Sequence, residues 1–128
     1  MNLLVDTRIL VWTLLEPERI PRAFEHVLVD PSNEIWYSSL SVWEIVTKIQ
    51  IGKMSLGRDF ETAIKAQGLK YLPFESRHAL KQFDLPLHHR DPFDRGLMAQ
   101  AAYERLKLMT SDQTLRQYAD NVDLIMVP

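Results

Sequence analysis

The sequence predicts an α/β fold in which a mostly parallel central sheet of four to five strands carries helices on both faces, giving three layers. Two observations predict this fold. Short apolar runs alternate with helical segments along the whole chain, and such alternation is typical of parallel strands joined by helical crossovers. No linker, low-complexity tract or internal repeat interrupts the alternation. We therefore expect residues 1–128 to form a single domain.

The expected elements follow one another in a regular order. Strands are predicted at residues 2–5, 34–38, 69–74, 106–109 and 124–127. Helices are predicted at residues 7–15, 21–29, 42–49, 59–66, 75–83, 91–105 and 114–118, with a loop at residues 85–90.

The helix in the middle of the chain has the clearest periodicity. Val42, Ile45, Val46 and Ile49 recur at i, i+3, i+4 and i+7, which is the spacing of one helix face. Gly52 stands where it can end the helix. The stripe predicts an amphipathic helix.

Composition limits the classes of function. The 128 residues are 46% hydrophobic, which is enough for one core. The absence of cysteine excludes disulfides, thiolate zinc sites and a cysteine nucleophile. The N-terminus lacks the basic start and apolar centre of a signal peptide, and the apolar run at residues 9–15 is far shorter than the roughly 18 residues of a membrane span. We expect a cytoplasmic protein that does not associate with membranes.

The charge balance bears on nucleic-acid binding. A net charge of −2, with a pI near 6.1, argues against a protein that coats nucleic acid, because such a protein carries a basic excess. It is compatible with a nuclease, since a cluster of metal-binding carboxylates lowers the total charge.

Two aspartates follow predicted strands. Asp6 comes directly after the first strand, and Asp112 comes after the fourth. In an open parallel sheet the functional groups lie beyond the carboxyl ends of the strands. Neither turn is rich in glycine, which excludes a dinucleotide fingerprint and a phosphate-binding loop. Each aspartate, taken alone, is equally suited to cap the helix that follows it.

Three further acids also have structural interpretations. Asp91 is placed to cap the helix that begins after it, and Asp94 then lies in the first turn, where an acid favours the positive helix end. Glu44 falls nearly opposite the apolar stripe of its helix, with Lys48 one turn on, which predicts a surface ion pair. Taken singly, each acid is explained by local structure.

Four stretches carry these acids in a fixed order. They are residues 3–12 (LLVDTRILVW), residues 38–45 (SSLSVWEI) followed by Lys48 and residues 51–53 (IGK), residues 89–101 (HRDPFDRGLMAQA) and residues 109–112 (MTSD). Together, in this order and at these separations, they resemble the PIN-domain nucleases of the VapC toxin type. Two positions depart from that pattern: Arg8 stands where a histidine is common, and Gly96 stands where a bulkier apolar residue is usual.

The resemblance implies a metal-dependent endoribonuclease with a PIN-like fold. It implies that Asp6, Glu44, Asp94 and Asp112 converge on one or two divalent ions, with Asp91 as a further contributor. Hard cations held by carboxylates make water nucleophilic at neutral pH and neutralise the leaving oxygen, so Mg²⁺ or Mn²⁺ is expected. The resemblance further implies an RNA substrate, a small antitoxin protein as partner, pairing as a homodimer, and the role of toxin in a type II toxin-antitoxin system.

Basic and aromatic residues beside the acids are candidates for RNA contact. The cations placed to contact phosphates, or to be solvated surface charges, are Arg8, Lys48, Lys53, Arg90 and Arg95. His88 and His89 are expected to be exposed in a polar loop rather than to bind metal. Trp36 is expected in the core, whereas Trp12 and Trp43 are placed to stack on unpaired bases or to cover a partner's surface.

Features of the sequence also bear on three other functions. A phosphoacceptor receiver domain has a similar layout, but the strand at residues 69–74 has no aspartate and the last strand has no lysine. A PIN-like binding module with a decayed site is not indicated, because all four acids are present. A nuclease of RNA processing without an antitoxin stays open. A short upstream reading frame for a small antitoxin would distinguish a toxin from a nuclease of RNA processing.

Overall fold

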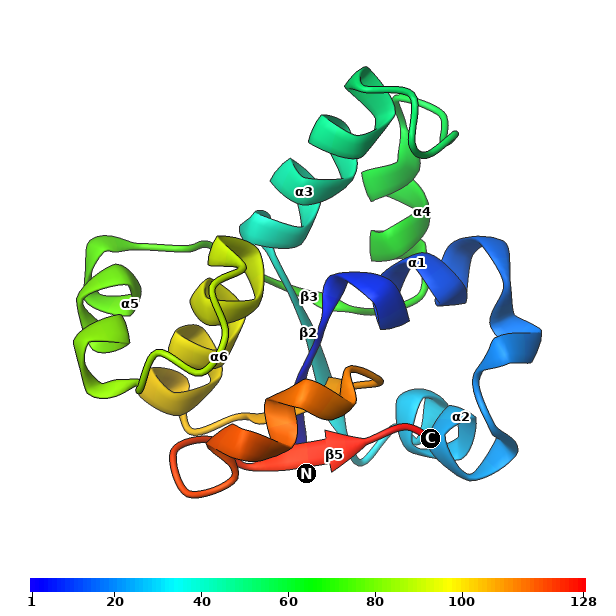
Figure 1. Ribbon diagram of the computed structural model, residues 1–128. Coiled ribbons are helices and arrows are strands. Elements are labelled where there is room, and N and C mark those ends of the chain that lie inside the picture. Colours follow the sequence, from blue (N-terminus) through cyan, green and yellow to red (C-terminus); the bar gives the residue numbers. More distant parts are fainter.

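The computed structural model describes residues 1–128 and has a central sheet with helices on both faces (Figure 1). The sheet has five strands in the order β3-β2-β1-β4-β5, and every neighbouring pair is parallel. The strands are β1 (Asn2–Val5), β2 (Glu34–Ser38), β3 (Lys70–Leu72), β4 (Lys107–Thr110) and β5 (Leu124–Met126). The predicted three-layer α/β fold is confirmed.

The helices connect the strands in the expected alternation. The α-helices are α1 (Thr7–Leu15), α2 (Arg22–Val29), α3 (Ser39–Gln50), α4 (Phe60–Ala66), α5 (Ser76–Lys81) and α6 (Pro92–Glu104). Three short 3₁₀ helices are η1 (Pro17–Arg19), η2 (Gln82–Asp84) and η3 (Gln113–Tyr118). None of the helices combines the length and the apolar character that a membrane span requires.

Two hydrophobic cores lie on opposite faces of the sheet. Successive strand residues point to opposite faces, so Leu3 and Val5 belong to the core beneath α1, α2 and α4, while Leu4 belongs to the core beneath α6 and η3. All three are fully buried. A central strand that is buried on both faces explains why the first apolar run is continuous rather than alternating.

Some local expectations were wrong. β3 is shorter than predicted, the helix expected at residues 75–83 is divided into α5 and η2, and η3 is a 3₁₀ rather than an α-helix. On α3, Val46 of the predicted apolar stripe is 42% exposed, whereas Glu44 is buried. The reason is that α3 packs against both α1 and α6, so its buried surface is not a single stripe.

The topology brings distant segments to one edge of the sheet. β1 lies between β2 and β4, and the Asp6 amide donates to the Met109 carbonyl at 3.0 Å, which extends the pairing beyond the end of β1. α3 begins directly after β2, and α6 runs back from this edge before β4 begins. The carboxyl ends of β1 and β4 therefore lie beside the first turns of α3 and α6.

Candidate active site

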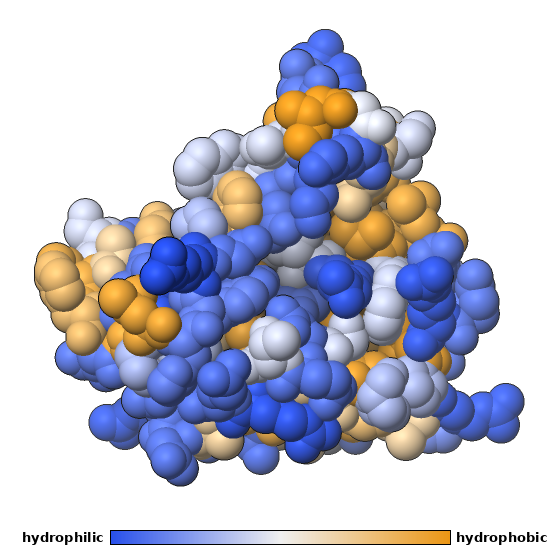
Figure 2. Space-filling view, viewed as in Figure 1, coloured by the Kyte–Doolittle hydropathy of each residue, from blue (hydrophilic) through white to orange (hydrophobic).

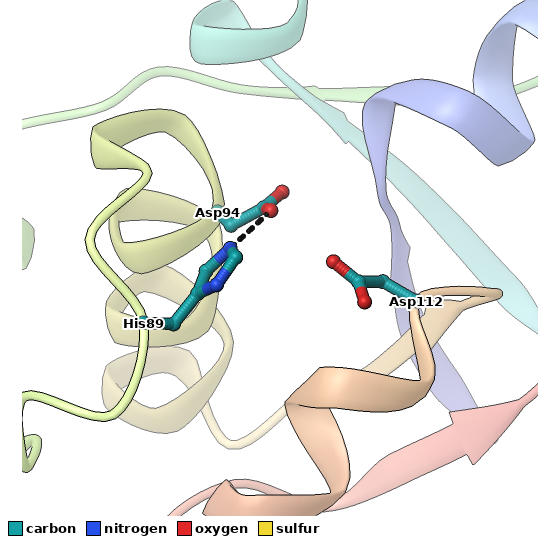
Figure 3. A group of neighbouring side chains, drawn as sticks. All are labelled: His89, Asp94 and Asp112. Atoms are coloured by element: carbon teal, nitrogen blue, oxygen red, sulfur yellow. Dashed lines mark hydrogen bonds and ion pairs between the residues drawn. The ribbon is translucent and has the colours of Figure 1, made fainter.

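Two carboxylates and an imidazole meet at this edge. His89, Asp94 and Asp112 each offer one ligand atom, and these three atoms lie within 4.8 Å of one another. His89 Nε2 lies 2.8 Å from Asp94 Oδ2, and the carboxylate of Asp112 points toward this pair from across the gap (Figure 3). The surface between α6 and α1 on this face is mostly hydrophilic (Figure 2).

Asp112 is held by the start of η3. Its Oδ1 accepts hydrogen bonds from the amide of Thr114 at 3.0 Å and from the Thr114 hydroxyl at 2.7 Å. One oxygen thus caps the helix, as the sequence predicted. Its other oxygen is left for a ligand.

Asp91 caps α6. Its Oδ1 accepts from the amides of Phe93 at 2.9 Å and Asp94 at 3.0 Å, and its side chain is exposed. The predicted cap is confirmed. Asp91 lies outside the group of three ligand atoms, as Asp6 and Glu44 also do, and its role as a further metal ligand stays a prediction.

Asp6 caps α1 from a buried position. Its Oδ1 accepts from the amide of Ile9 at 2.8 Å, and its side chain is 5% exposed. Burial raises the pKa of Asp6 to about 6, against the lowering effect of hydrogen bonds from Thr110 and Ile9. The negative charge of Asp94 raises it further. Asp6 lies outside the group of three ligand atoms, but its charge is coupled to that group.

Burial also raises the pKa of Asp94. The hydrogen bond with His89 acts in the opposite direction, while the charges of Asp91 and Glu44 add to the rise. Mutual repulsion of this kind is what a bound cation relieves.

Glu44 carries an unpaired oxygen. Its Oε2 lies 2.9 Å from Lys48 Nζ, so the predicted ion pair is confirmed, although Glu44 is buried and not at the surface as expected. Its Oε1 is buried and has no hydrogen-bond partner. Leaving a charged oxygen unpartnered costs free energy. An oxygen-binding cation would supply the missing partner, so the donor set fits a hard divalent ion.

The cations predicted to contact RNA divide into three kinds. The side chains of Arg8, Lys53 and Arg90 are exposed, so they are free to meet a phosphate. Lys48 is half-buried and paired with Glu44. Arg95 differs from the expectation, because it is buried and is not free to contact RNA.

Arg95 is 8% exposed, and both terminal nitrogens of its guanidinium donate hydrogen bonds within the protein. Its Nη1 donates to Pro86 O at 2.9 Å and to Tyr118 Oη at 3.2 Å, and its Nη2 donates to Gln82 O at 3.3 Å. The side chain points beneath the loop before α6 and not toward solvent. Local sequence could not reveal this, because the position is set by tertiary packing.

His89 was missed as a site residue. The sequence suggested an exposed loop histidine, whereas its ring bonds to Asp94. A usable signal was present, since His89 opens the same motif that contains Asp94.

Of the tryptophans, Trp36 packs against the core as expected, and Trp43 is 63% exposed with its ring 5.1 Å from Phe93.

A sizeable cavity lies elsewhere. It has a volume of about 730 Å³ and is bounded by η1, α2 and the amino ends of β2 and β3. None of the four predicted acids lines it. The acid cluster therefore lies outside this cavity.

Comparison with known proteins agrees with this arrangement. The PIN domain family model matches residues 3–121, while no curated relative matches the sequence. The chain resembles VapBC2 from Rickettsia felis, bound to a promoter DNA fragment, with a TM-score of 0.74 and 16% identity over 100% of both chains. FitAcB from Neisseria gonorrhoeae gives 0.68 at 20% identity, over 98% of this chain and 96% of that one.

A toxin-antitoxin complex from Klebsiella pneumoniae gives a TM-score of 0.64 at 19% identity, over 97% of this chain and 96% of that one. At these identities the likeness is one of fold. The family match is of another kind, because it spans nearly the whole sequence, including all four acidic motifs. The chain belongs to the PIN-domain family.

Proposed function

We propose that the chain is a divalent-cation-dependent endoribonuclease whose acid set is Asp6, Glu44, Asp94 and Asp112, and that residues 1–128 form one nuclease domain. The observation that carries the proposal is the buried, unpartnered Oε1 of Glu44 beside a group of carboxylates whose pKa values are raised. Buried carboxylates so close together repel one another when they are ionised, and a bound cation would neutralise their charge.

The expected cofactor is Mg²⁺ or Mn²⁺, as one or two ions, because all four acids offer hard oxygen donors. Asp94, Asp112 and Glu44 each have an oxygen that caps no helix, and the buried Asp6 adds a charge that interacts with Asp94. When bound, the cation would activate water for in-line attack and neutralise the leaving 3′ oxygen. Lys48 holds Glu44 in place at 2.9 Å.

RNA is the proposed substrate because the four motifs resemble those of VapC-type ribonucleases. Arg8, Lys53 and Arg90 are exposed and stand beside the acidic motifs in the sequence, and we propose that they bind phosphates on either side of the scissile bond. Two of the acids are buried and two are half-buried, so a splayed single strand suits the site better than a closed duplex, because its backbone can approach the acids.

We further propose that this nuclease is the toxin of a type II toxin-antitoxin pair, acts in the cytoplasm, and forms a homodimer. The solved structures of similar fold support the role of toxin, since they include toxin-antitoxin complexes. A role in RNA processing without an antitoxin is the alternative. A short reading frame for a small antitoxin beside the gene would favour the toxin.

A cleavage assay on total RNA tests the proposal. We expect the purified chain to cut RNA with Mg²⁺ or Mn²⁺ and to stop when EDTA removes the cation. An Asp94→Asn preparation, purified identically, controls for contaminating ribonucleases and should be inactive. Cutting that persists in EDTA, or no cutting with either cation, would overturn the proposed function.

A further inference from the structure

The loop before α6, at residues 85–90, is irregular, yet one of its residues is held firmly. Leu87 is 78% exposed, and His88 beside it is also exposed. In His89, by contrast, both the backbone amide and the backbone carbonyl make hydrogen bonds. Its amide donates to Tyr118 Oη at 2.8 Å, and its carbonyl accepts from Arg95 Nη1 at 3.4 Å.

Arg95 holds the rest of the same segment. Its guanidinium donates to the carbonyls of Gln82, Leu85 and Pro86, from η2 to the middle of the loop. It has no carboxylate partner within ion-pair distance. Burying a cation among neutral groups is costly unless its donors are satisfied, and here Nη1 and Nη2 donate to backbone carbonyls of this segment and to the Tyr118 hydroxyl.

The hydroxyl of Tyr118 completes the arrangement. It donates to Pro86 O at 2.8 Å and accepts from His89 N and Arg95 Nη1. One donated and two accepted bonds use the whole capacity of a phenolic oxygen. Tyr118 is fully buried at the end of η3, and η3 begins at its cap, Asp112. One short element therefore fixes Asp112 at its start and the backbone of His89 at its end.

We propose that His89 is a positioning residue for Asp94, and that Arg95 and Tyr118 hold it in place. The inference rests on the proposed function. The imidazole Nε2 forms a hydrogen bond with Asp94 Oδ2 at 2.8 Å, and this bond fixes the plane of the carboxylate (Figure 3). The other oxygen of Asp94 is then left for the cation. Hydrogen-bonding partners of this kind commonly set the affinity of a metal site.

The first test compares two neighbouring histidines, with Mn²⁺ as the probe. His89→Ala should raise the dissociation constant for Mn²⁺ by about ten-fold or more and slow RNA cleavage. His88→Ala is the matched control, because His88 is exposed in the same loop, and its ring packs edge-on against that of Tyr118 without a hydrogen bond to the Tyr118 hydroxyl or to the acids. Equal Mn²⁺ affinity in the two variants would overturn the inference.

A spectroscopic measurement separates positioning from direct ligation. Pulsed electron paramagnetic resonance of the wild type loaded with Mn²⁺ should show no coupling to a histidine nitrogen, since His89 acts through Asp94. A coupled nitrogen that disappears in His89→Ala would contradict the positioning role.

Tyr118→Phe tests the rest of the arrangement while keeping the ring in the core. It should weaken Mn²⁺ binding in the same direction as His89→Ala, and combining the two changes should add little, because Tyr118 acts through His89. A Tyr118→Phe protein that is less stable but binds Mn²⁺ as the wild type does would contradict the proposal that Tyr118 holds His89 in place. If the wild type itself binds no Mn²⁺ and cuts no RNA, the proposed function fails first.

Discussion

At the scale of single residues, capping and site chemistry share the same side chains. Asp6 and Asp112 each cap a helix with Oδ1, and a carboxylate has a second oxygen to offer. The two interpretations that competed in the sequence are therefore compatible. Asp94 differs, because its carboxylate makes no cap and bonds instead to His89.

Asp6→Asn should separate the two roles of this residue. The folded-state pKa of Asp6 is about 6, against 3.8 for an ordinary aspartate, so the folded protein holds this proton more tightly than the unfolded chain does. The stability that this group contributes is present below about pH 4 and is lost as the pH rises through about 6. Asparagine still caps the helix but carries no charge.

Without metal, Asp6→Asn should therefore be more stable than the wild type near pH 7, by up to about 3 kcal/mol. The difference should shrink as the pH falls and vanish below about pH 3, where Asp6 is protonated in both the folded and the unfolded state. Urea unfolding in EDTA across this range measures it. A difference that does not change with pH would show that the charge of Asp6 carries no such cost.

At the scale of secondary-structure elements, α6 carries residues with opposite tasks. Asp94 faces the site, whereas Arg95 points beneath the preceding loop. Gly96, the departure from the family pattern, has a packing reason. An added Cβ would collide with Leu40 Cδ1 and lie 3.4 Å from Phe74 Cε2. The glycine lets α6 approach the first turn of α3, the helix that carries Glu44.

Gly96→Ala should therefore destabilise the protein despite the better helix propensity of alanine. The propensity gain is about 1 kcal/mol, and overpacking a buried contact costs about 1 to 3 kcal/mol, so a net loss of about 1 kcal/mol is expected. In a Leu40→Ala background the collision is removed, and the same change should stabilise. Equal effects in both backgrounds, measured by urea unfolding, would refute the packing argument.

At the scale of the whole molecule, the strand order explains how motifs far apart in sequence meet. β1 lies at the centre with β2 and β4 beside it, so the segments that follow these strands share one edge. The alternation of elements predicts a parallel sheet, but it does not fix which strands are neighbours. The acid motifs supply that information only through their resemblance to a known family.

Other features could not be predicted, because they depend on tertiary packing. Glu44 lies opposite the apolar stripe of its helix, yet α3 packs on two sides and buries it. Arg95 stands next to Asp94 in sequence, but the loop and η3 close over it. The role of His89 likewise depends on Tyr118, which is distant in the sequence.

The central claim is that the converged carboxylates bind a cation that RNA cleavage requires, and Asp112→Asn tests it most directly. Asparagine retains the cap of η3, and Asp120→Asn is the control, because Asp120 is exposed just after the same element. Mn²⁺ at about 100 times its dissociation constant should stabilise the wild type and Asp120→Asn by roughly 2.7 kcal/mol, and both should cut RNA. Asp112→Asn should lose most of that stabilisation and all cleavage. An Asp112→Asn protein that keeps the full Mn²⁺-induced stabilisation and still cuts RNA would contradict the account.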